Sequence, residues 1–218
     1  MKREIAIGAA EARVFGVLVE KSLTTPDQYP LTLNSATTGC NQKSNRQPVL
    51  DFGEDVVATA LDRLEEKYLV RRVYPGNSRV EKYCHNGKDA LGLETPVLAV
   101  LAELLLRGPQ TAGELRAHAG RMTALPGLDE LTAIVERLIE LDYVERLAPL
   151  PGSRAERFVQ KLSPGLHPVD PGAAVPLRAA PVAAAVPSAA LDELADRVER
   201  LEAEVARLQQ VVARLAGA

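Results

Sequence analysis

The sequence contains no tryptophan, two cysteines and few aromatic residues, with five Tyr and three Phe among 218 residues. So few rings weaken any interpretation based on base-stacking platforms or aromatic ligand cages. Two cysteines do not make a disulfide framework in a chain of this size, which favours a reducing, cytoplasmic compartment. No stretch approaches 18 uninterrupted apolar residues, and charges interrupt the first apolar segment early. We therefore expect neither a membrane span nor an export signal.

An excess of positive charge is also missing. The chain has 26 Lys and Arg against 29 Asp and Glu, a formal net charge of −3 and a pI near 5.7. This balance excludes attraction of the whole molecule to phosphate but leaves a locally basic surface possible. Residues 1–90 carry 13 basic and 12 acidic side chains, and residues 91–162 carry 8 and 10. Neither segment has the basic excess on which nonspecific nucleic-acid affinity depends.

What is present is an internal repeat at an offset of 74 residues. Segment 61–70 aligns with segment 135–144, and a Pro-Gly turn follows each. Apolar residues spaced three and four apart predict a helix in each copy. Two short strands should follow, 69–74 with 79–83 and 143–148 with 155–162.

Each copy begins with another strong apolar helix, the first ending near Lys21 and the second at Arg107, before Gly108-Pro109. A shorter helix follows in each, at 33–40 with Thr32 as its cap and at 112–120 with Thr111 as its cap. Three helices and a hairpin in under 80 residues are the order of a winged helix-turn-helix. The sequence thus predicts a mainly α fold with small β-hairpins, built from two tandem winged helix-turn-helix modules, residues 1–90 and 91–162.

The composition changes after Leu162. Residues 163–189 contain six Pro and eight Ala, with only Asp170 and Arg178 charged. Such a segment has too little apolar side-chain area to offset the entropy of ordering, so we expect a flexible Pro/Ala-rich linker.

The last segment, residues 190–216, has an unbroken heptad pattern. β-Branched residues at a with Leu at d favour two parallel strands, which predicts a coiled-coil helix and a homodimer. The alternative is a lone amphipathic helix docked on the globular part. The expected dimerisation residues alternate three and four apart: Leu191, Leu194, Val198, Leu201, Val205, Leu208, Val212 and Leu215.

The most informative polar stretch lies where a helix-turn-helix places its turn and the start of its recognition element. Amides can hydrogen-bond to adenine edges, and cations can contact phosphate or guanine. The alternative is a solvated loop in which Asn and Ser close turns. The nucleic-acid-binding candidates in this stretch are Asn41, Gln42, Lys43, Asn45 and Arg46.

The two hairpins, or wings, supply further candidates: Arg79 and Lys82 in the first, and Arg154 and Arg157 in the second. Wing cations often contact phosphates, although solvent-facing strand positions also carry cations to discourage edge pairing. One feature argues against DNA. The helix before the first wing, which would enter the major groove, follows Asp51 and opens with acids.

Catalytic arrangements are hard to assemble from this sequence. His85, His118 and His167 are scattered, and Cys84 and His85 should point to opposite faces of a strand. Cys40 ends a small apolar face and is expected to be a core thiol. No paired-cysteine metal spacing, phosphate-cradling glycine loop or nucleophile elbow is present. We expect no enzymatic activity, no catalytic residues, no metal and no cofactor.

Two long motifs resemble the YceH family of bacterial proteins. The first runs through TTPDQYPL at 24–31, Asn34 and CNQKSNRQPV at 40–49, and the second is LLRGPQTAGELR at 105–116. The resemblance covers about residues 9–162 and extends to the C-terminal heptad helix. It implies a tandem winged-helix fold without an established biochemical role, so no catalytic residues carry over.

These features lead to one main hypothesis and one alternative. The main hypothesis is a nonenzymatic, dimeric, cytoplasmic protein that binds double-stranded DNA through the 41–47 loop and the first wing and acts in transcriptional control. The alternative is a protein-interaction adaptor, similar to chromosome-segregation proteins that pair two acidic winged helices. An effector held between the modules is a third option, which no convergent polar cluster supports.

Replacing Leu201 with Pro should convert the dimer to a monomer, because Pro removes a helix hydrogen bond and clashes with the preceding turn. Light scattering of both chains, at concentrations on the order of tens of micromolar, measures the change. A parent chain that is already monomeric there would refute the coiled-coil hypothesis.

Overall fold

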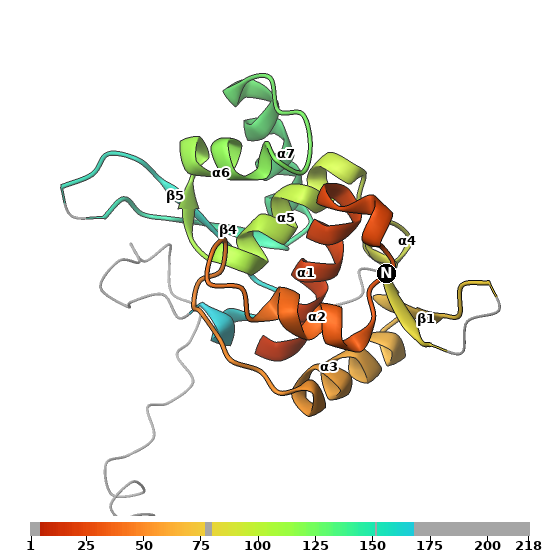
Figure 1. The fold of residues 1–218 in the computed structure, drawn as a ribbon. Coiled ribbons are helices and arrows are strands. Elements are labelled where there is room, and N and C mark those ends of the chain that lie inside the picture. Colours follow the sequence, from red (N-terminus) through yellow and green to blue (C-terminus); the bar gives the residue numbers. More distant parts are fainter. Residues whose placement is uncertain (1–4, 77–79, 151, 168–218) are drawn as a thin grey trace, which may run out of the picture. The chain divides into compact units, whose positions relative to one another are not determined.

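The computed structural model describes residues 5–76, 80–150 and 152–167. The described part is mainly helical with small antiparallel sheets, as the sequence predicts (Figure 1). Its α-helices are α1 Ala9–Thr24, α2 Leu33–Cys40, α3 Glu54–Glu66, α4 Gly87–Leu91, α5 Thr95–Arg107, α6 Ala112–Ala119 and α7 Leu128–Glu140. Its strands are β1 Val70–Val73, β2 Lys82–His85, β3 Gln110–Thr111, β4 Val144–Leu147 and β5 Arg157–Gln160, and single 3-10 turns occur at Pro26–Gln28 and Pro164–Leu166.

Each hairpin gains a third extended segment from the residues just before a short helix. β1 pairs with β2, and Leu31, ahead of α2, forms a bridge to Tyr83 of β2. In the other sheet β5 lies between β4 and β3, and β3 comes immediately ahead of α6. The order helix, extended segment, two helices and hairpin thus occurs twice, and it is compatible with the winged-helix fold.

Local hydrogen bonds explain where the helices begin and end. The hydroxyl of Thr32 accepts from the Ser35 amide at 3.2 Å, and that of Thr111 accepts from the Glu114 amide at 3.3 Å, which confirms both predicted caps. α3 and α7, the third helix of each half, end alike. Tyr68 and Asp142, which are 74 residues apart and follow these helices, both adopt left-handed backbone, with φ of 62° and 63°.

Several predicted boundaries were wrong. The first helix continues to Thr24, the first hairpin pairs Val70–Val73 with Lys82–His85, and neither β3 nor α4 was expected. The predicted linker also begins too early, because Leu166 and His167 are buried and His167 Nε2 lies 2.6 Å from the Gln47 carbonyl oxygen. This packed segment was predicted as linker because its composition is rich in proline. The rest of the predicted linker and the 190–216 coiled coil lie outside the described residues.

The two helix–hairpin sets share one hydrophobic core. α1 makes its most extensive contact with α5, and the two helices run side by side through the middle of Figure 1. All described residues belong to one compact unit, Met1–Val175, whereas Pro176–Ala218 is assigned to a second unit that lies outside them. The buried faces of α1 and α5 therefore serve both halves, and the predicted boundary between residues 90 and 91 stays a prediction.

Gly16 permits the close approach of α1 to α5. A Cβ atom at this position would lie 3.1 Å from two side-chain atoms of Leu106 and 3.4 Å from Cβ of Leu105. Any larger side chain must displace these leucines.

Replacing Gly16 with Leu should lower the free energy of unfolding by about 1–3 kcal/mol through overpacking. The matched control is Gly113→Leu in α6, where nothing lies within 4 Å of the new Cβ and helix propensity should raise stability by up to about 1 kcal/mol. Denaturant titration measures both. Equal losses would contradict the close packing inferred for Gly16.

Candidate nucleic-acid interface

The 41–47 loop is closed by its own amides. The Asn41 side chain donates to the Phe52 carbonyl at 2.9 Å and accepts from the Phe52 amide at 2.8 Å. These two bonds join the start of the loop to the segment that leads into α3. Both ends of the amide are occupied, so Asn41 fixes the shape of the loop.

Arg46 points inward, whereas the predicted nucleic-acid contact requires it to face solvent. Its side chain is fully buried, and its guanidinium contacts Glu20 of α1 through two bonds, Nη2–Oε2 at 2.6 Å and Nη1–Oε1 at 3.2 Å. It also donates to the Gly39 carbonyl at 3.0 Å and to Gln42 Oε1 at 2.9 Å. A buried polar group of this kind is not on the surface for a nucleic acid to contact.

Arg46 belongs to a larger ion-pair network, formed by Glu20, Arg46, Glu103, Arg107 and Arg121. Arg121, just after α6, bonds Glu20 with one nitrogen and Glu103 of α5 with the other, the latter at 2.8 Å. Glu103 also pairs with Arg107 at 2.8 Å, and Arg107 donates to Asn45 Oδ1. The network therefore ties the loop to α1, to α5 and to the segment after α6.

The charges of the network compensate one another. Burial alone would raise the pKa of the Glu20 carboxyl, but the hydrogen bonds and charges of Arg46 and Arg121 hold it below its usual value. Glu20 is thus ionised at neutral pH although almost none of it is exposed. Removing one partner would leave a buried charge uncompensated.

Arg13 of α1 holds the loop from beneath. Its guanidinium donates to the carbonyls of Cys40 at 3.3 Å and Pro48 at 2.7 Å, the residues on either side of the 41–47 loop. Burial and then the charge of Arg46 lower the pKa of Arg13 to about 10, so it remains a cation at neutral pH. Cys40 is a buried core thiol, as predicted, and its burial raises its pKa to about 12.

The remaining cation of the loop faces solvent. Lys43 and its neighbour Ser44 are exposed at the turn. A hollow lies beside the loop, between α2 and the end of α1, and polar groups dominate its lining: Lys21, Thr25, Gln28, Asn34, Ser35, Thr38 and Gln42. Of the five loop candidates, Lys43 is the exposed one, and the side chains of the other four are hydrogen-bonded within the chain: Arg46 to Gln42 and Glu20, Asn41 to Phe52, and Asn45 to Arg107.

The wing candidates are scattered. Arg79 lies outside the described residues, Lys82 and Arg157 are half-buried, and Arg154 is exposed.

Arg72 and Arg146, two other wing cations, are paired within the chain, whereas Arg71 of β1 is exposed. Arg72 of β1 pairs with Asp62 at 2.6 Å and with Glu65 and Glu81 at 3.3 Å each. Arg146 of β4 pairs with two glutamates in the same way: Glu136 and Glu156. The described sheet surfaces are therefore of mixed sign.

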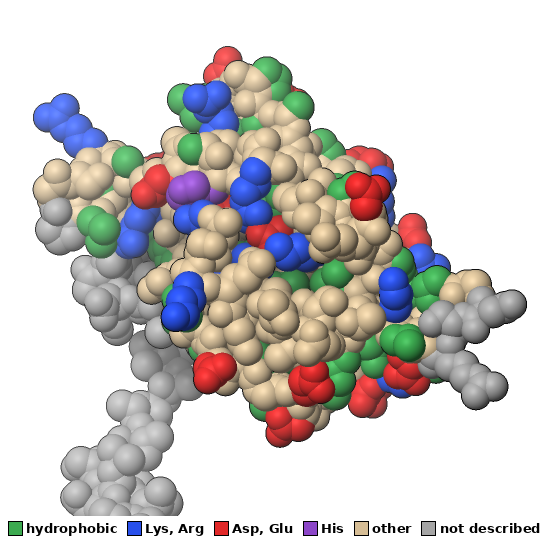
Figure 2. Space-filling model, viewed as in Figure 1, with side chains coloured by type: hydrophobic (Ala, Val, Ile, Leu, Met, Phe, Trp, Pro, Cys, Tyr) green, Lys and Arg blue, Asp and Glu red, His purple; other side chains and the backbone are tan. Residues whose placement is uncertain are grey.

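Acidic groups dominate the exposed face of α3, the helix that precedes the first hairpin. Its exposed acids are Glu54, Asp55, Asp62 and Glu66. Figure 2 shows acidic side chains along this edge of the molecule. α7 likewise opens with exposed Asp129 and Glu130. α3 and α7 thus both expose negative charge to solvent, and negative charge repels phosphate.

Ser22 and His85 are in hydrogen-bond contact but do not form a nucleophile–base pair. The Gly87 amide donates to His85 Nδ1 at 3.3 Å, which places the ring proton on Nε2, where it is donated to Ser22 Oγ at 2.9 Å. Burial, followed by the charges of Arg71 and Lys88, lowers the pKa of His85 to about 4. The neutral ring has no free nitrogen to accept the Ser22 proton, as a general base must.

Among the described residues, no three His, Cys, Asp or Glu side chains come close enough together to hold a metal ion. None of the helices in this part of the chain combines the length and the apolar character needed to cross a bilayer.

Sequence reasoning missed Glu20 and Glu103, although a signal was present. Each is an acid within an apolar helical run, VLVEKS and LAELLL. Acids are almost never fully buried unless they are paired. Two such positions therefore indicate internal cationic partners, which the sequence alone does not identify.

The fold and the loop define a small helical protein, compatible with the winged-helix class, whose core contains buried ion pairs. Comparison with known proteins agrees with the motifs. The model of the family described as "Protein of unknown function, DUF480" matches residues 7–162. A UPF0502 protein of Geotalea uraniireducens is 48% identical over 162 residues, 73% of each chain.

The UPF0502 protein YceH of Escherichia fergusonii is 41% identical over 217 residues, and that of Salmonella paratyphi A is 39% identical. Each alignment covers 96% of this chain and 95% of the relative. The chain therefore belongs to the YceH, or UPF0502, family, and the resemblance found in its motifs is confirmed.

Replacing Arg46 with Met should destabilise the fold by about 3–5 kcal/mol, because Glu20 loses a buried partner. Lys43→Met, the same change on an exposed cation of the same loop, should alter stability by no more than about 0.5 kcal/mol. Denaturant titration of both variants measures the difference. A mild effect at Arg46 would show that the network is not needed for the fold.

Proposed function

We propose that this chain is a nonenzymatic adaptor built from two winged-helix modules, which binds a basic surface of a partner protein through the exposed acidic face of α3. One observation carries this proposal. Arg46, Arg72 and Arg121 pair with acids of the chain itself, whereas Glu54 and Asp55 in the first turn of α3 are exposed. Complementary charge of this kind favours a cationic partner.

The position of α3 strengthens this argument. In the usual winged-helix geometry the third helix lies in the major groove, close to phosphates on both sides. Here its first turn carries Glu54 and Asp55, and Arg63 is the basic residue of its last turn. Exposed acids at this position would repel the phosphates and weaken DNA binding. The same helix surface can bind lysines and arginines of a protein.

Dimerisation would strengthen such a contact. In this proposal the heptad residues 191–215 pair two chains, so that each dimer presents two acidic faces. A second contact then forms at the effective concentration set by the linker, which raises overall affinity without new contacts.

DNA binding through α2 is the second candidate function. The observation in its favour is exposed Lys43, which directly follows Gln42 in the chain, and Gln42 and Lys21 both line the polar hollow. Hydroxyl and amide groups with two nearby cations suit a phosphate backbone. In this arrangement α2 and the loop, rather than α3, would contact the duplex.

Charge reversal distinguishes the two functions. Glu54→Lys/Asp55→Lys on α3 should weaken binding of the native protein partner at least tenfold, since like charges then face each other. Asp129→Lys/Glu130→Lys is the matched control, because it reverses two exposed acids in the equivalent first turn of α7. Two lysines at the start of either helix are equally unfavourable to the helix dipole, so the two variants should lose similar amounts of stability.

The measurement is a pull-down from the native cytoplasm with the full chain, treated with nuclease and moderate salt, followed by titration of the purified partner. Partner proteins that stay bound after nuclease and salt treatment, and whose affinity falls with the α3 variant but not with the α7 control, support the adaptor. Partners lost with nucleic acid, together with duplex binding at low ionic strength that Lys43→Ala weakens, would support DNA binding instead.

A further inference from the structure

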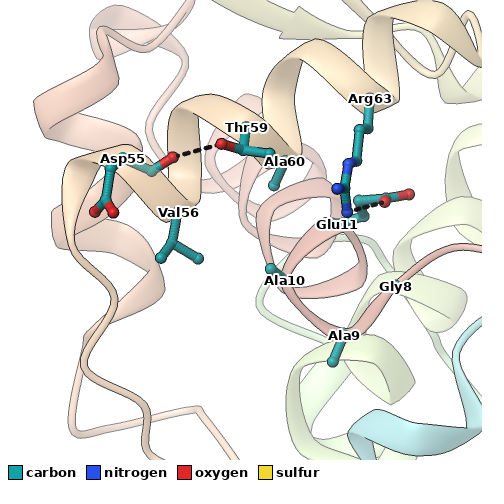
Figure 3. A pocket seen from close by; sticks show the side chains of 9 residues that line it. All are labelled: Gly8, Ala9, Ala10, Glu11, Asp55, Val56, Thr59, Ala60 and Arg63. Carbon is teal, nitrogen blue, oxygen red and sulfur yellow. Dashed lines mark hydrogen bonds and ion pairs between the residues drawn. The ribbon is translucent and has the colours of Figure 1, made fainter. Parts of the chain in front are cut away.

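A pocket opens beside the acidic face, where α3 crosses the first turn of α1 (Figure 3). Its volume is about 380 Å³, near the lower end of the range for ligand sites. We call it the α1–α3 pocket. Its lining residues are Gly8, Ala9, Ala10 and Glu11 from the start of α1, and Asp55, Val56, Thr59, Ala60 and Arg63 from α3.

Small apolar side chains form the wall of this pocket. In Figure 3 Val56 and Ala60 project from α3 toward Ala9 and Ala10 of α1. Val56 is 37% exposed, so a valine on this helix remains partly in contact with water. An apolar group that entered the pocket would remove both its own surface and this valine from water, which is favourable.

Two polar side chains of the pocket, Thr59 and Glu11, are engaged within the chain. The Thr59 hydroxyl donates to the Asp55 carbonyl at 2.8 Å, and Glu11 pairs with Lys67 and, at 4.0 Å, with Arg63. Sites for small polar molecules need several convergent groups that fix orientation, whereas the remaining charged groups, Asp55 and Arg63, stand at opposite ends of this pocket. The pocket therefore suits an apolar side chain.

Charge is distributed unequally around the pocket. The Asp55 end continues into Glu54 and exposed Asp51, whereas the other end is closed by Arg63 and its partner Glu11. A partner with cations on one side of its apolar residue would meet acids on that side and avoid Arg63. The charge pattern therefore specifies a direction as well as a sign.

From this arrangement we propose that the α1–α3 pocket receives one apolar side chain from a basic segment of the partner protein, whose Lys or Arg residues contact Asp51, Glu54 and Asp55. This inference rests on the proposed adaptor function and adds to it the anchor and its orientation. An apolar anchor in a pocket, surrounded by complementary charges, is the common form of a binding hot spot.

The probe is a phage-displayed library of random twelve-residue peptides, selected on the full chain, with individual peptides then synthesised and titrated by fluorescence anisotropy. Selected peptides should share one apolar residue with Lys or Arg on one side. Replacing that apolar residue with Ser should weaken binding about tenfold or more.

Thr59→Trp, which fills the pocket, should weaken binding of these peptides at least tenfold. The matched control is Thr132→Trp on α7, since Thr132 is also exposed and its hydroxyl donates to the carbonyl four residues earlier, that of Leu128, at 2.8 Å. This control should leave affinity unchanged, and circular dichroism checks that both variants fold.

The outcomes separate the pocket from the adaptor function. Binding that Glu54→Lys/Asp55→Lys abolishes but Thr59→Trp leaves intact would overturn the pocket and retain the acidic face. Peptides insensitive to both variants, or a selection without basic peptides, would overturn both proposals. Peptide binding that is lost in both α3 variants and is retained in both α7 controls supports the anchor.

Discussion

The buried carboxylate of Glu20 is the group on which the arrangement of this molecule depends. An acid in the middle of an apolar helix is stable there only if cations accompany it. Arg46 and Arg121 provide them, one from the 41–47 loop and one from the segment after α6. Because these partners come from distant parts of the sequence, satisfying one charge fixes the loop on α1 and joins the two halves of the fold. Two amides of the loop, Gln42 and Asn45, accept hydrogen bonds from arginines of the same network.

This internal use of cations shapes the surface. The chain has nearly equal numbers of basic and acidic residues, but position decides which of them a partner meets. Arginines of the network, and Arg72 and Arg146 on the sheets, are paired within the chain. The acids at the start of α3 and α7 remain in water, where they also compensate the helix dipoles. A chain of nearly neutral charge thereby exposes acids at the start of α3 and α7, and the proposal of a basic partner rests on those of α3.

Packing between α1 and α5 adds a second constraint. Gly16 allows these helices to approach, and their apolar faces belong to one continuous core. The repeated order of elements therefore does not produce two separate cores in the described residues. Each half retains its own hairpin, capped short helix and third helix, while the first helices of the two halves are buried against each other. Stability in one half should consequently depend on residues in the other.

Local information in the sequence determined much of this protein. Threonine caps, apolar spacing and the repeat at an offset of 74 predicted the main helices, both hairpins and the class of fold, because helix starts and buried faces depend on residues a few positions apart. The family followed from two long motifs. Only the tertiary structure decided which way Arg46 points, that β3 and α4 form, and that the packed chain continues to His167. Those features depend on partners such as Glu20 and Gln47, more than 20 and 100 residues away, and a polar loop has the same composition whether its arginine faces water or a buried acid.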